Sequence, residues 1–473
     1  MELDKDLQAR QQARDFARQA QQAQKILAQM PQQRLDEIVR AVADAFAKAS
    51  GELAELAVRE TGFGNVTDKM TKNEFASKKV LSAIEKMTCV GVLKENPAEK
   101  LWEIGVPVGV ICGIVPSTNP TSTVCYKAMI ALKAGNSIVF SPHPKAIACT
   151  MRAANIVAAA AESAGAPKGS VSCLTIPSMA GCKELMEAEE TRLILATGGP
   201  AMVKAAYSSG KPAIGVGAGN GPVYIHHSAD VQQALACVLQ SKTFDYGTVC
   251  ASEQSIIVEA AMEQEVREKA TKMGFYFMDK AEAGCLAKLL FKPNGTLNPE
   301  IVGKAATTLA EKAGFSVPST TKVLVAREQE AGPTRPYSME KLCPVLAFFV
   351  MENEDAVLQK AIEVLVHEGS GHTFAMHAQD RAVIEKFALQ IPVSRFLVNT
   401  PAALGGIGAT TGLFPALTLG CGAVGGSSSS NNISPMDLIN IRRVAWGVES
   451  RPTPAVDENL LEILTTKILE RLK

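Results

Sequence analysis

The sequence has no block of charge of one sign. Its 48 Lys and Arg residues balance 48 Asp and Glu residues, so the formal net charge is zero. Nucleic acids and anionic membrane surfaces favour basic partners, and this composition predicts neither of them. Gly and Pro interrupt the longest apolar runs well before the length of a membrane span, and four of the first six residues are charged. We therefore expect a cytoplasmic protein that acts on small molecules, with no nucleic acid and no membrane as partner.

Paired cysteine spacing is also missing. The 11 cysteines are odd in number and scattered, and none forms a Cys-x-x-Cys pair. An odd, scattered set without that spacing argues against both a disulfide framework and a structural zinc site, so we expect reduced thiols and no metal. No G-x-x-x-x-G-K-[ST] segment occurs, which argues against a P-loop ATPase. Gly420 to Gly425 matches G-x-G-x-x-G, but a Ser- and Asn-rich loop follows it instead of a helix, so we discount it as a dinucleotide motif.

Apolar periodicity predicts an α/β protein. The 473 residues, 47% of them hydrophobic, are enough for two or three domains. Residues 7 to about 90 have helical spacing. From Val106 to Val216 apolar runs alternate with helix-like stretches, which predicts about five parallel strands covered on both faces. A second alternating series, from Val223 to Val398, predicts another α/β domain. Gly405 to Asn432 is dense in Gly, Thr and Ser and predicts loops around a site.

Cys250 has the surroundings of a nucleophile. Gly247 allows a tight backbone approach three residues earlier, and small residues after the thiol leave space in front of sulfur for a substrate carbon. Most intracellular cysteines are inert small hydrophobes, so a core position is the alternative for Cys250.

Two turns at the ends of predicted strands could bind ligands. Thr197, Gly198 and Gly199 lie between a strand and a helix, where free backbone N–H groups would face a cofactor phosphate. Asn119, in the Pro116 to Pro120 turn, could stabilise an oxyanion together with the backbone N–H of Cys250. An ordinary β-α turn and an ordinary Asn-Pro turn are the alternatives.

Together these segments resemble the CoA-acylating branch of the aldehyde dehydrogenase superfamily over roughly residues 5 to 447. The resemblance rests on Pro116–Pro120, Ser141–Pro144, Thr197–Gly199, Phe244–Gln254, Glu340–Val345, Gly371–Thr373 and Thr418–Gly422. It implies two doubly wound α/β domains, for the cofactor and for catalysis, plus a small oligomerisation element. The implied bounds are 1–95 and 112–221 for the dinucleotide-binding domain, 222–418 for the catalytic domain, and 96–111 with 419–447 for the oligomerisation element. A homo-oligomer, dimer or tetramer, is implied as well.

The resemblance also implies NAD in the crevice between the two domains. Cys250 would be the nucleophile, Asn119 the oxyanion donor and Glu340 the carboxylate that accepts hydrogen bonds from the nicotinamide ribose. Without the resemblance, Glu340 would be read as a solvated surface carboxylate. The other implied cofactor residues are Pro116, Thr118, Ser141, His143, Thr197, Gly198, Gly199, Val216, Gly217 and Leu342. Many hydrolytic relatives have a lysine against the adenosine ribose where this chain has Ser141, which leaves NAD and NADP both open; His143 is a candidate for that space.

The segment Gly215 to Pro222 separates the two branches of the superfamily. Hydrolytic aldehyde dehydrogenases carry a glutamate near Val216 that activates water, and this segment contains no acid. A thioester without that base should persist until a thiol arrives, since a thiol ionises far more easily than water. Coenzyme A is therefore the expected acyl acceptor, and acetaldehyde or propanal the expected substrate. A hydrolytic enzyme that releases the free acid, and a non-catalytic scaffold or cargo-linking protein, are the alternatives.

His372 is a candidate for proton transfer. Imidazole titrates near physiological pH, and the residue stands in the matching segment Gly371 to Thr373. An isolated histidine is also often structural or solvated, which is the alternative for His372.

The C-terminal residues predict a separate element. Residues 448–457 contain two prolines and predict a linker, while residues 458–473 predict an amphipathic helix. This helix has Leu461, Leu464, Ile468 and Leu472 on one stripe. It could dock on its own body or on a neighbouring subunit. It also resembles the peptides that direct enzymes into bacterial microcompartments, which implies shell or cargo proteins as partners and a location inside such a compartment.

Overall fold

The computed structural model describes residues 4–448 and 458–472. Helices open the chain, as the sequence predicts, with bounds α1 (Lys5–Leu27), α2 (Gln32–Lys48), α3 (Ser50–Thr61), α4 (Val66–Glu74) and α5 (Val80–Ile84). The side chain of Asn65 caps α4 by accepting a hydrogen bond from the backbone N–H of Asp68. The turn of π-helix that follows, Phe75–Lys79, continues α4 into α5.

A five-stranded sheet follows this helical segment. Its strands are β3 (Val110–Ile114), β4 (Ser137–Ser141), β5 (Val171–Cys173), β6 (Thr191–Thr197) and β7 (Ala213–Val216). All pairings are parallel and the order is β5-β4-β3-β6-β7, which confirms the prediction of about five parallel strands. The direction of winding changes between β3 and β6, and in open α/β sheets the crevice beyond the carboxyl ends at that point binds ligands.

Helices cover both faces of this sheet. On one face α2, α6 (Pro120–Lys133) and α7 (Ile147–Ser163) pack with Ile111, Ile138 and Phe140 in one core cluster. On the other face α1, α8 (Met179–Glu187) and α9 (Pro200–Tyr207) pack with Val110, Cys112 and Val139. Neighbouring residues of β3 thus belong to different clusters, as alternating strand side chains require.

The second sheet has seven parallel strands, in the order β10-β11-β12-β9-β8-β13-β14. Their bounds are β8 (Gly221–Ile225), β9 (Glu253–Glu259), β10 (Phe275–Phe277), β11 (Val323–Arg327), β12 (Val345–Met351), β13 (Gly371–His377) and β14 (Val393–Val398). Six of these strands match apolar runs in the series that the sequence predicts from Val223 to Val398. The three-residue β10 does not, because so short a segment shows no strand periodicity.

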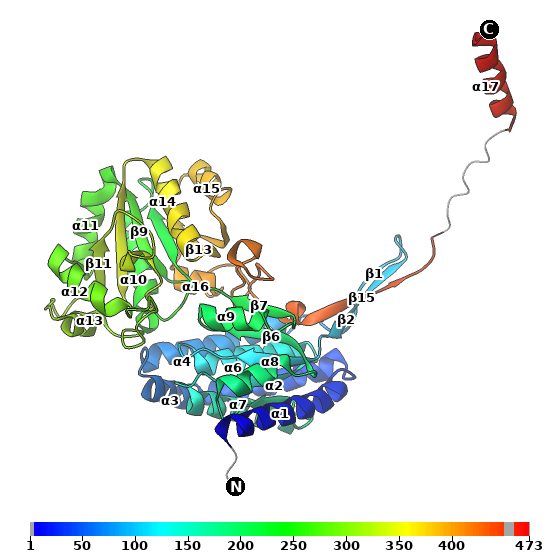
Figure 1. The fold of residues 1–473 in the computed structure, drawn as a ribbon, viewed down its shortest axis with the longest axis horizontal. Coiled ribbons are helices and arrows are strands. Elements are labelled where there is room, and N and C mark those ends of the chain that lie inside the picture. Colours follow the sequence, from blue (N-terminus) through cyan, green and yellow to red (C-terminus); the bar gives the residue numbers. More distant parts are fainter. Residues whose placement is uncertain (1–3, 449–457, 473) are drawn as a thin grey trace.

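Helices cover both faces of the second sheet as well. On one side lie α10 (Val231–Thr243), α11 (Glu263–Lys272) and α16 (Ala402–Gly406). On the other lie α12 (Lys280–Leu290), α13 (Ala306–Ala313), α14 (Glu354–His367) and α15 (Arg381–Ala388). Figure 1 shows the two helix-covered sheets as separate bodies that meet near β7 and α16. The structure thus has the mixed α/β fold that the sequence predicts.

A third, antiparallel sheet projects from the first body (Figure 1). It contains β1 (Gly91–Asn96), β2 (Leu101–Pro107) and β15 (Ile439–Ala445), with β2 in the middle. The predicted oligomerisation element supplies β2 and β15, but the sheet begins at Gly91, inside the segment 1–95 predicted for the dinucleotide-binding domain. Conversely, Val110 and Ile111 belong to β3, so the predicted bound at 111 is too late by two residues. The division of the chain into domains otherwise remains a prediction.

The C-terminal helix predicted for residues 458–473 is confirmed as α17 (Glu458–Arg471). Its predicted stripe is exposed, with Leu461, Leu464 and Ile468 each retaining 50 to 58% of their accessible surface. Except for Val448, the predicted linker 448–457 lies outside the described residues. In the described ranges, no helix combines the length and the apolarity needed to cross a membrane.

Candidate active site

The predicted phosphate-binding turn Thr197–Gly199 lies at a pocket at the carboxyl edge of the first sheet. A cavity of about 370 Å³ is lined by residues that follow β3, β4 and β6. Six of the predicted cofactor residues are among its lining residues: Pro116, Ser141, His143, Thr197, Gly198 and Gly199. The pocket therefore lies at the reversal of strand order, where the fold places ligands.

Gly199 makes this pocket suitable for an anion. It precedes Pro200, the first residue of α9. Pro200 has no N–H, and the N–H groups of Met202 and Val203 both donate to the carbonyl of Gly199, so Ala201 is the residue of this turn whose N–H can face the pocket. A Cβ atom added at Gly199 would meet no atom within 4 Å, so the space in front of the helix is open. The residues present thus fit the diphosphate of a dinucleotide.

Thr118, Val216, Gly217, Glu340 and Leu342 do not line this pocket. Val216 ends β7, a Cβ atom added at Gly217 would lie 3.9 Å from Cys421 Sγ, and Glu340 binds Gly219 beside Cys250, as described below. Leu342 has a positive φ of 46° and its carbonyl accepts a hydrogen bond from the N–H of Gly303. The structure thus divides the predicted cofactor residues between the pocket and the region around Cys250.

The turn before Cys250 is held in a rare backbone conformation. Asp245 and Tyr246 have φ values of 49° and 51°, in the left-handed region that non-glycine residues seldom adopt. The buried Asp245 carboxylate accepts hydrogen bonds from Lys69, Lys72, Thr248 and the backbone N–H of Asn65. These contacts fix the turn to α4 and hence fix the position of the loop that carries Cys250.

Gly247 and Gly219 allow close backbone contacts on either side of this loop. A Cβ atom at Gly247 would lie 2.9 Å from backbone atoms of Cys343, which supports the predicted tight approach. A Cβ atom at Gly219 would lie 1.8 Å from the carbonyl oxygen of Cys250. The acid-free segment after β7 therefore packs directly on the candidate nucleophile.

Cys250 is half-buried, and its charge environment favours the neutral thiol. Limited contact with water, followed by Glu340 and Cys421, raises the thiol pKa to about 12, while the nearby Arg395 acts in the opposite direction. Glu340 accepts a hydrogen bond from the N–H of Gly219 at 3.0 Å. Burial and the charge of Glu368 raise the pKa of Glu340 to about 8, so this carboxyl is mostly protonated at neutral pH.

Alkylation of Cys250 by iodoacetamide is expected to be slow at neutral pH. Only the thiolate reacts, so the rate should rise about tenfold for each pH unit between about pH 7 and about pH 10. Quenched samples analysed by peptide mass spectrometry separate Cys250 from the exposed Cys285. A rate that stops rising below about pH 8 would contradict the raised pKa of the thiol.

Asn119 is placed at the start of α6 and is bound through its carbonyl oxygen. It is the N-cap residue of α6, and its Oδ1 accepts a hydrogen bond from Lys72 Nζ at 2.6 Å. Lys72 Nζ also lies 3.0 Å from Thr248 Oγ1, two residues before Cys250. The structure thereby connects the candidate oxyanion donor to the candidate nucleophile's loop through one ammonium group.

His372 is fully buried in the described structure. Its Nδ1 lies 2.9 Å from Thr373 Oγ1, and its Nε2 has no hydrogen-bond partner there. Burial, and secondly the charge of Arg395, hold the pKa of His372 well below its usual value, so the imidazole is neutral at physiological pH. A neutral imidazole can accept a proton, but the predicted role of His372 remains a prediction.

Arg395 and Cys421 are near the site and were not expected from the sequence. Arg395 Nη2 donates to the carbonyl of Gly420 at 2.7 Å and lies 3.4 Å from that of Gly371. Cys421 belongs to the discounted G-x-G-x-x-G segment, whose backbone packs so closely on Gly371 that a Cβ atom there would lie 1.8 Å from the Cys421 carbonyl oxygen. In the sequence, Arg395 is a charged residue within the apolar run that forms β14. A charge at such a position needs a specific partner, and this feature could have indicated that Arg395 belongs to the site.

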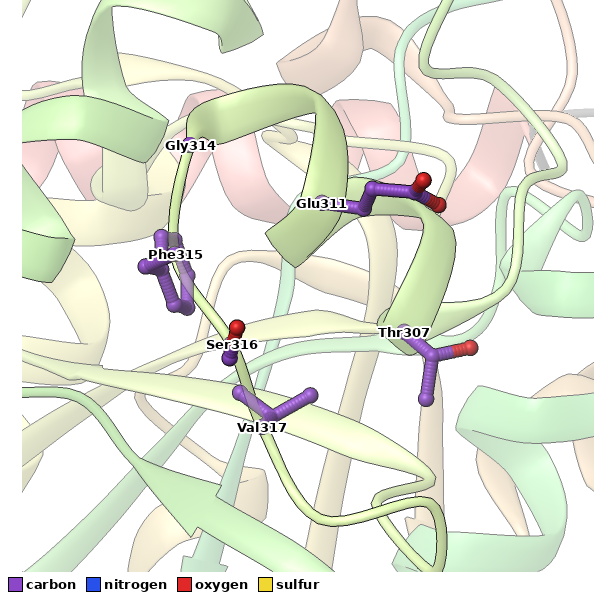
Figure 2. A pocket seen from close by; sticks show the side chains of 6 residues that line it. All are labelled: Thr307, Glu311, Gly314, Phe315, Ser316 and Val317. Atoms are coloured by element: carbon purple, nitrogen blue, oxygen red, sulfur yellow. The ribbon is translucent and has the colours of Figure 1, made fainter.

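A second depression, shown in Figure 2, lies at the end of α13 and has a volume of about 290 Å³. It is lined by Thr307, Glu311, Gly314, Phe315, Ser316 and Val317. None of the predicted site residues is among them, so this depression does not compete with the pocket at the first sheet.

His226, His227 and Glu259 lie close enough to be considered as metal ligands. However, Ser228 Oγ accepts hydrogen bonds from the N–H groups of Gln379 and Asp380, so its own proton is directed to His226 Nδ1, 2.8 Å away. The proton of a neutral His226 is then on Nε2, the nitrogen that a metal would need. The expected absence of a metal site remains a prediction.

Comparison with known proteins identifies the family. The Aldehyde dehydrogenase family profile matches residues 6–274. The bifunctional aldehyde-alcohol dehydrogenase AdhE of Escherichia coli K12 is 46% identical over 433 residues, which cover 90% of this chain and 48% of AdhE. The chain thus spans about half the length of this curated relative. It belongs to the aldehyde dehydrogenase family.

Solved structures show the same fold over nearly whole chains. An acetylating aldehyde dehydrogenase from Geobacillus thermoglucosidasius has a TM-score of 0.93 and 49% identity, with 95% of this chain and 99% of that one covered. A propionaldehyde dehydrogenase from a Clostridium phytofermentans fucose utilisation microcompartment has a TM-score of 0.84, 28% identity and coverages of 92% and 98%. The Rhodopseudomonas palustris propionaldehyde dehydrogenase, solved with CoA and an acylated cysteine, has a TM-score of 0.84, 28% identity and coverages of 92% and 97%.

Proposed function

We propose that this protein is a CoA-acylating aldehyde dehydrogenase. It converts a short aliphatic aldehyde, NAD⁺ and coenzyme A to acyl-CoA, NADH and a proton. The observation that carries this proposal is the contact between Cys250 and the acid-free segment around Gly219. The acylated cysteine and bound CoA of the Rhodopseudomonas palustris relative support it.

Catalysis begins with the loss of the proton from Cys250. The thiolate adds to the carbonyl carbon of the aldehyde, and a bond from sulfur to carbon forms while the oxygen becomes an oxyanion. The Asn119 amide and the backbone N–H of Cys250 donate hydrogen bonds to this oxygen. NAD⁺, when bound, supplies the acceptor for the hydride that leaves the carbon. Cys250 then holds the acyl group as a thioester.

The second stage transfers the acyl group to CoA. The CoA thiolate adds to the thioester carbon, the same donors bind the oxyanion, and Cys250 leaves as a thiolate. Glu340 is the carboxyl group next to Cys250, but at neutral pH its raised pKa leaves it mostly protonated and unable to take a proton from water. Water is therefore not activated at the thioester. CoA would need the space in front of the Cys250 thioester that the nicotinamide occupied, so we expect ping-pong kinetics.

The dinucleotide is held by the pocket at the first sheet. Thr197, Gly198 and Gly199 would present the N-terminus of α9 to its phosphates, and Ser141 and His143, which line the same pocket, would contact the adenosine ribose. We assign NAD as the cofactor and Glu340 as a ligand of its nicotinamide ribose. KM values for NAD⁺ and NADP⁺ measured side by side test the preference between the two.

Replacing Gly199 by aspartate should weaken dinucleotide binding without unfolding the protein. Gly199 has ordinary negative φ and open space around it, so a side chain fits, but a carboxylate there repels phosphate. The expected KM for NAD⁺ is about tenfold higher. Gly199→Asn, which has the same shape without the charge, is the matched control. Equal KM values for the two variants would argue against phosphate binding at α9.

A short, linear aldehyde is the proposed substrate, with propanal favoured over acetaldehyde. Initial rates of NADH formation with C2 to C5 aldehydes, with and without CoA, test the reaction and its chain length together. The proposal expects acyl-CoA of matching mass as the product. Free acid as the main product in the presence of CoA would instead favour the hydrolytic alternative, and no NADH with any aldehyde would favour a scaffold.

Self-association through the third sheet is proposed for the assembly. Trp102 and Trp446 pack edge to face at 5.0 Å on this projecting sheet, and Val92 and Ile441 remain exposed. Such an apolar arm is typical of an interface between copies. Light scattering after size exclusion is expected to show a dimer or tetramer.

Helix α17 is proposed to direct the enzyme into a bacterial microcompartment by binding shell or cargo proteins. Its exposed apolar stripe supports this role, as does the Clostridium phytofermentans relative. Deleting residues 455–473 is expected to abolish co-assembly with shell proteins and to leave turnover unchanged. Ile468→Asp should act like the deletion, whereas the neighbouring Lys467→Asp should not. Undiminished loading of the truncated enzyme would refute this role.

A further inference from the structure

Lys72 has a contact that the reaction outlined above does not use. It lies on α4, only 3% of its side chain is exposed, and its ammonium nitrogen is surrounded by three oxygen atoms. These are Asn119 Oδ1 at 2.6 Å, Thr248 Oγ1 at 3.0 Å and Asp245 Oδ2. An ammonium group has three N–H bonds, so all of its donors are engaged by these partners.

This contact determines which way the Asn119 amide faces. An ammonium group has no acceptor, so only the carbonyl oxygen of Asn119 can face Lys72. The Nδ2 group must then point away from Lys72. Within the part of the chain that the structure describes, its hydrogen-bond contact is with the adjacent Thr118 Oγ1 at 3.5 Å, the outer limit of a hydrogen bond. The N–H bonds of Asn119 are thus left available for a substrate oxygen.

The charges around Lys72 also favour donation of hydrogen bonds from the Asn119 amide to a substrate oxygen. Lys69 and Lys72 share the single buried carboxylate oxygen Asp245 Oδ2, and the Asp68 carboxylate is a further negative charge near Lys72. Burial lowers the pKa of Lys72 to about 8, so its amine still carries a proton and a positive charge in most molecules at neutral pH. A positive charge against the carbonyl oxygen of an amide polarises it and makes its N–H bonds stronger donors. Chains of such bonds strengthen one another in a site with little water.

Lys69 provides an internal comparison. It lies one turn before Lys72 on α4, is equally buried and binds the same Asp245 oxygen at 2.9 Å. Its remaining contact is with the backbone carbonyl of Thr118, not with the side chain of Asn119. The two lysines therefore share burial and ion pairing but differ in contact with the Asn119 amide.

We propose that Lys72 is a positioning residue that orients and polarises the Asn119 amide as the oxyanion donor. This inference rests on the proposed function. Lys72 does not touch the substrate and acts through Asn119. Its bonds to Asp245 and Thr248 fix the position of the Asn119 amide relative to the loop that carries Cys250. The sequence gives no local sign of this role, because Lys72 and Asn119 are 47 residues apart.

A double-mutant cycle on the full-length enzyme tests the proposal, with acetaldehyde and propanal as substrates. Asn119→Ala is expected to lower kcat roughly 10²- to 10³-fold, the usual effect of losing one oxyanion donor. Lys72→Met should lower kcat roughly 10- to 100-fold with little change in the KM for aldehyde. The double variant should be no slower than Asn119→Ala alone, because Lys72 acts through that amide.

Two further variants separate positioning from folding. Lys69→Met, the matched control, removes the same burial and ion pairing without the contact to Asn119, so a kcat loss caused by disturbance of the Cys250 loop should appear there too. Lys72→Met should lose about fivefold or more in kcat beyond the Lys69→Met loss, and Lys72→Arg, which retains N–H donors, should recover part of it. Thermal unfolding of each variant reports any general loss of structure. Equal kcat losses at Lys69 and Lys72, or a Lys72→Met loss that persists in the Asn119→Ala background, would overturn the proposal. If Asn119→Ala itself keeps full activity, the oxyanion assignment of the proposed function fails together with this inference.

Discussion

Replacement of Cys250 by alanine is expected to lower aldehyde-dependent NADH formation by roughly 10⁴-fold or more. Without the thiol no bond forms to the aldehyde carbon, and hydride transfer from an unactivated aldehyde hydrate has no support from the protein. Losses of this size are typical when the nucleophile of a covalent mechanism is removed. Steady-state NADH absorbance with saturating aldehyde, NAD⁺ and CoA measures the effect.

The exposed Cys285 supplies the control for this variant. Cys285→Ala removes an exposed thiol on α12 and should leave turnover unchanged. Cys250→Ser keeps the shape of the side chain but offers a much weaker nucleophile, and it should be nearly as inactive as the alanine variant. A serine variant with activity close to that of the unmodified enzyme would exclude a thioester on this residue.

Omission of CoA is expected to reduce steady-state turnover at least about 100-fold. The thioester on Cys250 has no neighbouring base that activates water, so the enzyme should stop after one hydride transfer per active site. Rapid mixing with aldehyde and NAD⁺ should therefore show a burst of NADH equal to the number of sites, followed by almost no further production. Addition of CoA should restart turnover at the full rate.

The reductant in this experiment needs care, because dithiothreitol is itself a thiol that could accept the acyl group. A phosphine reductant avoids that problem. Sustained NADH formation without any thiol, matched by release of carboxylate, would show that water is activated after all. Glu340 would then be the first residue to replace, since it is the carboxyl group beside Cys250.

Much of the fold could be predicted because apolar periodicity reports burial directly. The runs from Val106 to Val216 became the five parallel strands and their helices, and the Gly198–Gly199 turn was found because turn chemistry is local in sequence. The residues at which the projecting sheet begins and ends could not be predicted from the sequence. Gly91 belongs to that sheet through pairing with Gly105, and nothing in the local pattern distinguishes its strand from a connecting segment.

Residues of the candidate site could be predicted only where their neighbours in the sequence indicated a function. Cys250 and Asn119 stand in distinctive segments, and the structure connects their surroundings through Lys72. Lys72 and Asp245 were missed because their importance comes from a contact between residues 173 positions apart. Arg395 lies in a run that predicts only a strand. A buried charge in that strand nevertheless indicates that the guanidinium has specific polar partners.

Intact-peptide mass spectrometry of the acylated enzyme tests the central claim most directly. The enzyme is mixed with propanal and NAD⁺ without thiol, quenched in acid and digested. The account predicts a propionyl mass on the peptide that contains Cys250, in an amount that matches the NADH released, and its disappearance when CoA is added before the quench. NADH release with no acyl mass on Cys250, or an acyl group lost equally fast without CoA, would contradict it.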